Sequence, residues 1–518
     1  MTVLVLGDQL CRTVGPLARR PDDRAVLIEA TAFARRLPYH PHKLVLVFSA
    51  MRHFRDELRS EGRNVDYRQV DTVADGLDAH FEAHPGDDLV VMHPASYGAA
   101  DRLRELIEGR GGSLEVVRDE RFLSDPGDFD AIAGDPPFRQ ETFYRAMRRE
   151  TGYLMDDGEP LGGAWNFDAD NRETPPEGYE PPPPPRFEPD AITREAIEWV
   201  EETFVDTDDG ATASHWADPD PFVWPVTRED ALAALEDFVA HRLADFGPYQ
   251  DAMVAGEPTL NHALLSPALN LGLLRPDEVI ERAIEATEGS DADHAEDGHD
   301  ATGAIPINSL EGFVRQVLGW REFVRHVYRR TMPDLARANQ LDADRDLPGF
   351  YWTGDTEMRC LRHAVQGVRR RGYAHHVERL MILSNFALLY GVDPSQLNRW
   401  FHAGFVDAFH WVTTPNVIEM GLFGAGTFAS KPYAASANYV NRMSDFCGDC
   451  RYDHRQTIGE DACPFNALYW AFLDRHEDRL RPMGRMGLVY SHLDDKNEAE
   501  LEAIRDRATS LRERIDER

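Results

Sequence analysis

The stretch Cys447-Gly448-Asp449-Cys450, followed by Cys463-Pro464, organises the second half of the chain. A Cys-x-x-Cys pair presents two thiolates to one metal ion or cluster without straining the backbone. We expect Cys360 as the fourth ligand, because Cys11 lies in a different predicted domain. Four thiolates at long, uneven spacing suit zinc or an iron–sulfur cluster, and the proline after the last cysteine favours the cluster. A disulfide or inert buried thiols are the alternatives.

Length and apolar patterning place the chain among multidomain soluble proteins. Its 518 residues predict two to four domains. No run of eighteen apolar residues occurs, and the chain starts with a strand-like segment at Val3–Leu6. We therefore expect no signal peptide and no membrane span. Few cysteines and a thiolate site predict a reducing, cytoplasmic location.

The charge is strongly negative, at -35, and its distribution is unusual. Arginine carries nearly all positive charge, since the only lysines are Lys43, Lys431 and Lys496. Acidic residues spread over the whole sequence, as in the run Asp291–Asp297. This composition is typical of a halophilic protein from a salt-rich cytoplasm, where screening shortens the reach of charge to about 3 Å at molar salt. Net charge alone then does not exclude a nucleic-acid partner.

Residues 1–135 predict an α/β domain with a parallel, Rossmann-like sheet. Predicted strands lie at Val3–Leu6, Leu44–Phe48, Leu89–Met92 and Leu114–Val117, and predicted helices at Met51–Ser60 and Ala100–Glu108. Ligands of such sheets bind at the carboxyl ends of the strands, which points to Gly7–Gln9 and Ser49–Arg52. Ordinary strand-to-helix turns are an equally good interpretation of both segments.

Residues 136–225 predict an interdomain linker, and residues 226–518 predict a large all-α domain. The linker contains Gly162–Asp168 and five prolines at 181–185, which favour polyproline II. Apolar spacings of three and four predict helices at Glu229–Leu243, Pro276–Ala286, Leu310–Arg330, Met358–Arg370, Ala374–Leu389, Pro394–Ala403 and Ala467–Arg475. An acidic insert at about 288–304 predicts a disordered surface loop, and the charged tail Asp494–Arg518 predicts an amphipathic helix.

Cations and imidazoles gather around Cys360. The densest basic patch of the chain consists of Arg359, Arg362, Arg369, Arg370 and Arg371. Arginine suits phosphate because its planar fork donates two parallel hydrogen bonds, although a solvated helix face is the alternative. The neighbouring His375 and His376 are candidate proton donors near neutral pH, and a structural role is the alternative. Leu264–Gly272 contains a Ser-Pro turn that predicts a helix start able to hold phosphate.

Several longer motifs occur together with these features. They are Gly7–Gln9, Ser49–Phe54, Leu264–Gly272, Trp320–Phe323, Tyr373–Arg379, Asp407–Trp411, Lys431–Ser436, Asn441–Cys450 and Ala462–Ala467. Together they resemble the photolyase/cryptochrome superfamily, and within it the iron–sulfur prokaryotic branch whose characterised members repair (6-4) photoproducts in DNA. The likeness extends from the first strand to the end of the helical domain.

The resemblance implies three cofactors. FAD is expected in a U shape inside the helical domain, against Tyr249, Thr259, Leu260, His262, Leu265, Ser266, Gln316, Trp320, Asp407, Ala408, Thr413 and Asn416. A [4Fe-4S] cluster is expected on Cys360, Cys447, Cys450 and Cys463. A 6,7-dimethyl-8-ribityllumazine antenna is expected near Gly7, Asp8, Gln9, Glu29, Ser49 and Met51.

The resemblance also implies a light-driven mechanism, in which excited reduced flavin lends an electron to a lesion flipped out of the duplex. His375, His376 and Tyr433 match the catalytic residues, and Trp352, Trp400 and Tyr439 match the electron-transfer residues. The arginine patch is expected to bind the UV-damaged DNA, and we expect a monomer. Two positions depart from relatives: Phe401 replaces a tyrosine, and Thr413 replaces an asparagine that faces flavin N5.

The first functional hypothesis is therefore a DNA (6-4) photolyase, a lyase of the DNA-repair class. The alternative is a cryptochrome-type blue-light photoreceptor with the same cofactors and no repair activity. A third hypothesis, an iron–sulfur DNA-binding subunit like the large subunit of archaeal primase, conflicts with the α/β domain and the flavin-pocket motifs.

Overall fold

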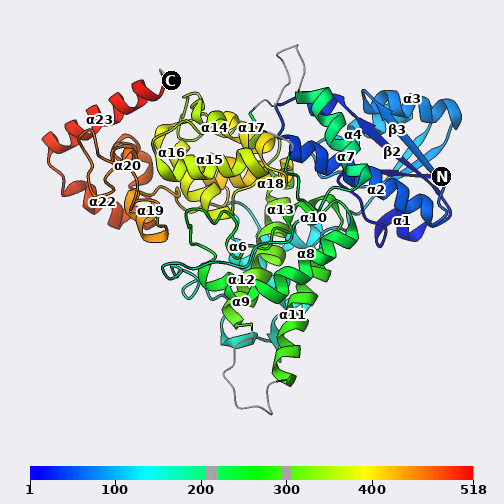
Figure 1. Cartoon of the computed structure of the whole chain (residues 1–518), viewed down its shortest axis with the longest axis horizontal. Coiled ribbons are helices and arrows are strands. Elements are labelled where there is room, and N and C mark those ends of the chain that lie inside the picture. Colours follow the sequence, from blue (N-terminus) through cyan, green and yellow to red (C-terminus); the bar gives the residue numbers. More distant parts are fainter. Residues whose placement is uncertain (206–215, 218–219, 294–304, 517–518) are drawn as a thin grey trace.

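The computed structural model describes residues 1–205, 216–217, 220–293 and 305–516. An α/β unit at the N-terminus lies at one end of the molecule, and helices form the remainder, with α23 (Glu498–Asp516) at the opposite end (Figure 1). This confirms the predicted combination of an α/β domain and a largely helical domain.

A five-stranded parallel sheet with the order β3-β2-β1-β4-β5 forms the centre of the first domain. Its strands are β1 (Thr2–Val5), β2 (Arg24–Ala30), β3 (Val65–Val70), β4 (Asp88–Met92) and β5 (Ser113–Val117). Helices α1 (Gly15–Arg19), α2 (Pro41–Ser60), α3 (Val73–Ala83) and α4 (Ala99–Glu108) connect the strands, with a short turn η1 (Ala32–Arg35). The strand order reverses between β1 and β4, which is where ligands of open α/β sheets bind.

The predicted strand at Leu44–Phe48 is wrong, because this segment lies inside helix α2. His40 caps the helix by accepting from the His42 backbone N–H, and Pro41 occupies its first turn. Helix α2 is buried on most sides, so its apolar run imitates a buried strand. The structure also contains β2 and β3, which the sequence pattern did not predict.

The segment 136–225 contains more regular structure than a linker needs. Helix α6 (Gln140–Thr151) buries Phe143, Tyr144 and Met147, and α7 (Ala191–Val200) packs on α2. A two-stranded hairpin, β6 (Met155–Asp156) with β7 (Glu159–Pro160), and a turn η2 (Leu161–Gly163) lie between them. The prolines 181–185 lie outside helices and strands, as expected. The predicted domain boundaries stay predictions.

The helices predicted after residue 227 are all present. In chain order the first set is α5 (Pro126–Ala133), η3 (Glu201–Val205), α8 (Arg228–His241), α9 (Leu243–Tyr249), α10 (Ser266–Leu271), α11 (Pro276–Asp293), α12 (Ile307–Val314), η4 (Arg315–Arg321), α13 (Glu322–Thr331), η5 (Asp334–Arg337), α14 (Phe350–Thr353) and α15 (Arg359–Arg371). The second set is η6 (Glu378–Ser384), α16 (Asn385–Tyr390), α17 (Pro394–Gly404), α18 (His410–Thr414), η7 (Pro415–Gly421), α19 (Ala437–Met443), α20 (Pro464–Arg475), α21 (Glu477–Leu480), η8 (Gly484–Met486), α22 (Gly487–Asp494) and α23.

The predicted loop at about 288–304 is wrong in its first part, because α11 continues to Asp293. Residues 294–304 lie outside the described residues. Among the helices that the structure describes, none is both long and apolar enough to cross a membrane.

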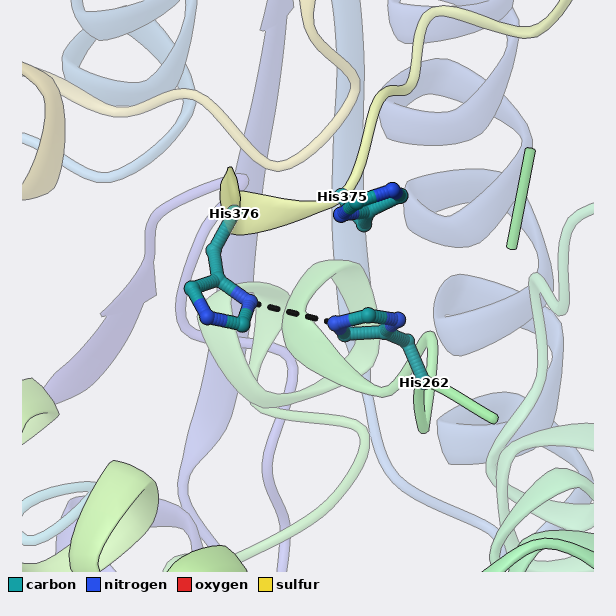
Figure 2. Close-up of side chains that lie close together, drawn as sticks. All are labelled: His262, His375 and His376. Carbon is teal, nitrogen blue, oxygen red and sulfur yellow. Dashed lines mark hydrogen bonds between the residues drawn. The ribbon is translucent and has the colours of Figure 1, made fainter. Parts of the chain in front are cut away.

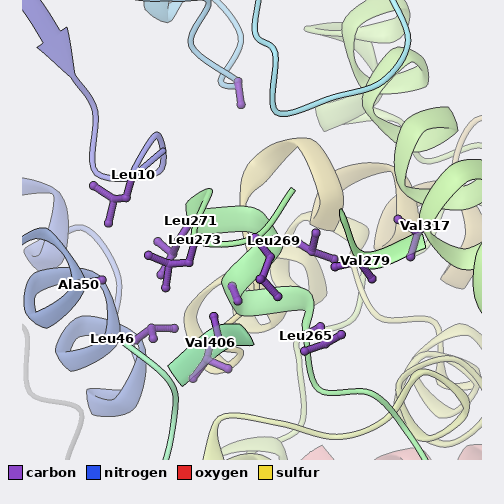
Figure 3. Close-up of a cluster of buried hydrophobic side chains, with 14 of the residues drawn as sticks. Leu10, Leu46, Ala50, Leu265, Leu269, Leu271, Leu273, Val279, Val317 and Val406 are labelled. Carbon is purple, nitrogen blue, oxygen red and sulfur yellow. The ribbon is translucent and has the colours of Figure 1, made fainter. Parts of the chain in front are cut away.

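Apolar and polar contacts join the two domains. Leu10, Leu46 and Ala50 from the first domain belong to the same buried cluster as Leu271 and Val406 from the helical domain (Figure 3). Lys43 of α2 donates to the backbone carbonyls of His402 and Ala408, both at 2.6 Å. The shared core fixes the position of the helical domain against the sheet.

Candidate active site and cysteine centre

Three π-helical segments interrupt the helices of the second domain. They are η4, which carries Gln316 and Trp320, η6, which begins at Glu378, and η7, which carries Asn416. Segment η6 packs against η7, and α13 packs against both η4 and η7. Because π segments are rare and occur often at functional sites, their convergence marks this region as the candidate site.

A buried carboxylate fixes the start of helix α10 in this region. Ser266 Oγ donates to Asp407 Oδ2 at 2.7 Å, and Arg379 donates to both oxygens of Asp407 at 3.0 Å. Asn270 donates to the Asp407 carbonyl at 2.9 Å. Just before α10, Leu260 and Leu264 take positive φ angles of 40° and 60°, a conformation that non-glycine residues keep only where their surroundings impose it.

Three histidines come together beside α10 (Figure 2). The rings of His262 and His375 stack at a centroid distance of 4.7 Å, and His376 lies edge-on to His262. His262 Nε2 and His376 Nδ1 are 3.1 Å apart. His375 is buried, whereas 48% of the His376 side chain is exposed. The pair predicted from sequence thus has one imidazole at the surface and one behind it.

The backbone determines which nitrogen of His262 carries hydrogen. His262 Nδ1 lies 3.0 Å from the carbonyl oxygen of Thr259, which can only accept, so Nδ1 is the donor. Burial lowers the pKa of His262 to about 3, and a neutral ring with hydrogen on Nδ1 has an accepting Nε2. His376 Nδ1 must therefore donate to His262, which leaves His376 Nε2 facing Asp251 Oδ1 at 3.5 Å. Sequence reasoning did not identify Asp251, Arg379 or Glu378.

The region around the predicted flavin residues fits a polar ligand. Gln316, Trp320 and Asn416 are only partly buried in otherwise buried helices. The buried Oε1 of Gln250 and Nε2 of Gln140 have no hydrogen-bond partner among the described residues. Buried polar atoms are normally satisfied, so these atoms indicate room for a bound polar group.

The four predicted cysteine ligands line one pocket together with Met358, Phe446, Tyr452 and Phe465. All are free thiols, so the disulfide alternative is wrong. Burial and then the neighbouring thiols raise the pKa of Cys360 well above its usual value, and burial raises that of Cys463 to about 12. Such thiols ionise only beside a strong positive charge, as a bound metal supplies.

The spacing of the sulfurs bears on which metal fits. A single tetrahedral zinc at 2.3 Å from each sulfur needs sulfurs about 3.8 Å apart. Within the described part of the chain, no three cysteine sulfurs lie within 4.8 Å of one another. The pocket therefore fits a larger group, such as a cluster, better than one zinc ion. Cys463 precedes α20 and Cys360 lies at the start of α15, where helix ends favour negative charge.

Helix α19 lies between the histidines and the cysteine pocket. Its Ala437 and Val440 line the pocket, and its Tyr439 has a pKa raised to about 12 by burial and by Asp251, the neighbour of His376. Tyr433, just before α19, is 37% exposed. The predicted tyrosines thus flank the site on the side of the cysteines.

The predicted tryptophans lie on an aromatic path that ends near the surface. Trp400 is fully buried, and its Nε1 donates to the Tyr351 carbonyl at 3.1 Å. The next residue, Trp352, contacts Trp216 edge-to-face at a centroid distance of 5.4 Å. Sequence reasoning missed Trp216. Phe401 packs edge-on against Trp400 at 5.3 Å, and Thr413 Oγ1 donates to the Phe409 carbonyl within its own helix.

The predicted antenna residues gather at the reversal point of the sheet, and several already have partners. Gln9 donates to the Met92 carbonyl at the end of β4, and Met51 lies against Gly7. Ser49 Oγ lies 3.0 Å from Thr193 Oγ1. Glu29 binds Arg52 through two hydrogen bonds of 2.8 and 3.1 Å. Burial raises the pKa of Asp8, which lies 3.6 Å from Arg121.

The arginine patch divides into engaged and free members. Arg359 pairs with Asp449 at 3.1 Å, and Arg369 donates to the carbonyls of Trp216 and Thr353. Arg371 is half-buried, and its Nε has no hydrogen-bond partner. Arg362 and Arg370 are exposed and make no ion pair with any described residue. These two side chains are the ones free to meet a phosphate.

Comparison with known proteins decides the family. A (6-4) photolyase from Agrobacterium fabrum is 40% identical over 99% of this chain and 99% of its own length. The chain belongs to the photolyase/cryptochrome family. Residues 3–216 also match the family model of deoxyribodipyrimidine photo-lyase-related proteins.

Solved structures of this family share the fold. A class III photolyase from Agrobacterium tumefaciens superposes with a TM-score of 0.60 and 16% identity, covering 100% of this chain and 98% of that one. The cryptochrome of Synechocystis sp. PCC6803 gives the same TM-score at 14% identity, covering 99% and 98%. The fold alone therefore does not separate repair enzymes from photoreceptors. Family membership implies FAD as a cofactor.

Proposed function

We propose that this protein is a light-dependent DNA repair enzyme that reverses (6-4) pyrimidine photoproducts. The full-length relation to a (6-4) photolyase carries the proposal. The histidine site supports it, because reversal of this lesion needs a proton donor at the mouth of the pocket. A photoreceptor without repair does not need His376 to be exposed and bound to a carboxylate.

His376 is suited to deliver that proton. Its Nδ1 hydrogen is engaged by His262, so only Nε2 exchanges a proton with a ligand. Asp251 next to Nε2 favours the doubly protonated imidazolium, which is the acid form. His375 supports the site from behind, and Tyr433 extends over its exposed side as a contact for the flipped lesion.

FAD, when bound and reduced, supplies the light-excited electron donor. The loop from Tyr249 through Thr259, Leu260, His262 and Leu265 to Ser266 would hold its phosphates and ribityl chain. Gln316, Trp320, Asp407, Ala408, Thr413 and Asn416 would surround its rings. The Arg379–Asp407 pair holds the start of α10 in place at this position.

The cysteine pocket would hold a [4Fe-4S] cluster on Cys360, Cys447, Cys450 and Cys463, which the sulfur spacing favours over zinc. Trp400 and Trp352 would carry electrons to the flavin, and Tyr439 lies on the cluster side. A lumazine antenna would bind near Gly7 to Gln9 and Met51, where Glu29 and Ser49 already have partners. Arg362 and Arg370 would bind the DNA backbone, with the other patch arginines behind them. We propose a monomer that acts in a salt-rich cytoplasm.

The deciding experiment illuminates reduced, purified protein with an oligonucleotide carrying one (6-4) photoproduct, in molar salt, and follows the lesion by chromatography. We expect conversion to intact thymines that requires light and is lost in His376→Ala. A duplex with a cyclobutane dimer serves as the control for lesion specificity. Absence of conversion in protein that contains photoreducible flavin would contradict repair and favour a photoreceptor.

A further inference from the structure

Glu378, the first residue of η6, is a buried carboxyl between two imidazoles. Its Oε1 lies 3.4 Å from His363 Nε2, and its Oε2 lies 3.7 Å from His375 Nε2. All three side chains are largely or fully buried, with exposed fractions of 2% for Glu378, 19% for His363 and 1% for His375. Both ring nitrogens lack a hydrogen-bond partner among the described residues.

These three groups can hold one proton more than their simplest charge state requires. If Glu378 is ionised, one imidazole beside it can carry a second hydrogen. If Glu378 is protonated, its O–H can donate to either ring. A polar group buried without a satisfied partner is costly, so such an arrangement needs a reason to persist.

We propose that Glu378 and His363 form a buried proton store behind the histidine pair and pass its proton to His375 Nε2. This inference rests on the proposed function, in which His375 and His376 manage the proton of the repair reaction. The transfer breaks the O–H bond of Glu378 and forms an N–H bond on His375, which leaves a carboxylate beside an imidazolium. The proton returns by the reverse step, so no oxidant or reductant takes part. Glu378 acts through His375 and is a positioning residue.

The surrounding charges make this exchange possible in both directions. Burial raises the pKa of Glu378 to about 8 and lowers those of His363, to about 4, and of His375. The resting proton therefore lies on the carboxyl near neutral pH. Arg371 and Arg379 favour the carboxylate that forms when the proton leaves.

Other titratable groups face the store from each packed element. Asp445 and the arginines 359, 370 and 371 act on His363, whereas His262, His376 and Arg379 act on His375. Negative charge that develops near His376 during repair would stabilise an imidazolium on His375. The store can thus respond to the reaction without contact with the lesion.

The position of His363 ties the store to the cysteine pocket. His363 follows Cys360 by one turn of α15, and its ring lies 4.9 Å from that of Phe446, which precedes Cys447. A contiguous set of titratable groups therefore runs from Asp251 at the surface through the three histidines and Glu378 to the helix that bears Cys360.

The test compares Glu378→Gln with Glu322→Gln in the complete protein. Glu322 is the matched control, because it is also fully buried but binds the backbone N–H groups of Leu123 and Ser124. Infrared spectra of wild type recorded against pH should show a protonated carboxyl that titrates with a midpoint near 8. Glu378→Gln should lose this titration, and Glu322→Gln should retain it.

The second readout is the pH profile of repair under saturating light. We expect the wild-type rate to fall as pH rises through about 8, where the store empties. Glu378→Gln should repair about tenfold or more slowly near neutral pH and lose that limb of the profile. If Glu378→Gln does not fold, His363→Gln should shift the same limb.

The outcomes separate this inference from the proposed function. A titrating carboxyl that disappears in Glu378→Gln supports the store even if no lesion is repaired, in which case only the proposed function fails. Unchanged infrared titration in Glu378→Gln overturns the store. An equal loss of rate at every pH, with the limb in place, also overturns it and assigns Glu378 a structural role.

Discussion

At the scale of the residue, the proton position on His376 depends on neighbours far away in the sequence. The carbonyl of Thr259 fixes hydrogen on His262 Nδ1, and His262 in turn directs His376 Nε2 towards Asp251. A carboxylate close to an imidazole favours the imidazolium, so Asp251 raises the fraction of His376 that can act as an acid.

Replacing Asp251 by Asn should therefore lower the pKa of His376. The pH at which repair falls off should move down, by about one unit for each 1.4 kcal/mol of lost interaction. Repair near neutral pH should drop several-fold and recover at lower pH. The pH dependence of the repair rate, measured under saturating light, checks this.

Asp245→Asn is the matched control, because Asp245 lies on α9 and binds Tyr179 instead of the histidines. Its profile should match wild type. A uniform loss of rate in Asp251→Asn without a shifted limb would show that Asp251 only supports the fold.

Sequence reasoning identified His375 and His376 because adjacent histidines at a helix start are uncommon and easily seen. It missed Asp251 because one aspartate among 91 acidic residues carries no local signal. Glu378 was hidden for a different reason: it lies in a helical pattern in which glutamate usually faces solvent. Only the tertiary packing of η6 against α15 buries it.

At the scale of the element, the cysteine pocket joins α15, α19 and α20, which are far apart in sequence. A cluster bound there would crosslink these helices. Cys447→Ser should abolish bound iron and its visible absorbance, and should lower the free energy of unfolding by an amount comparable to removing a disulfide, about 2–5 kcal/mol. Iron analysis and thermal unfolding of the purified variant check both.

Cys11→Ser provides the control, since Cys11 is a buried free thiol in the first domain. It should keep full iron content. Normal iron content in Cys447→Ser would contradict the assignment of this cysteine as a ligand.

The two free arginines of α15 give a separate prediction for DNA binding. The double variant Arg362→Ala/Arg370→Ala should weaken binding about equally for damaged and undamaged duplex. The slope of log affinity against log salt should fall by about two, roughly one for each lost phosphate contact. Equilibrium binding measured across a salt series tests this.

Arg359→Ala is the comparison, because Arg359 already pairs with Asp449. Its salt slope should change little. An unchanged slope in the double variant would place the DNA on another surface.

The helices of the second domain were predictable because each buries one apolar stripe. Their π segments were not, since one extra residue per turn leaves apolar spacing nearly unchanged. Helix α2 was mistaken for a strand because contacts with both domains bury its polar face as well, as the engaged Lys43 shows. Strand β3 was missed because its exposed, charged sequence lacks an apolar run.

At the scale of the whole molecule, buried neutral histidines control stability in acid. Burial lowers the pKa of His40, His262, His326, His363, His375, His402, His410 and His476. In the unfolded chain their pKa returns to about 6.5. Between that value and the lower native values the unfolded state binds more protons, so the free energy of unfolding decreases as pH falls.

The unfolding temperature should therefore drop steeply between about pH 7 and pH 5, with each such histidine contributing up to about 1.4 kcal/mol per pH unit. Measurement in molar salt screens the repulsion of the -35 net charge, which would otherwise weaken as carboxylates protonate and mask the effect. His476→Asn should flatten the dependence by one such contribution, because burial lowers the pKa of His476 to about 4. His492→Asn, at an exposed position, should leave it unchanged. Equal slopes in wild type and His476→Asn would mean that carboxylate protonation, and not histidine burial, governs acid unfolding of this protein.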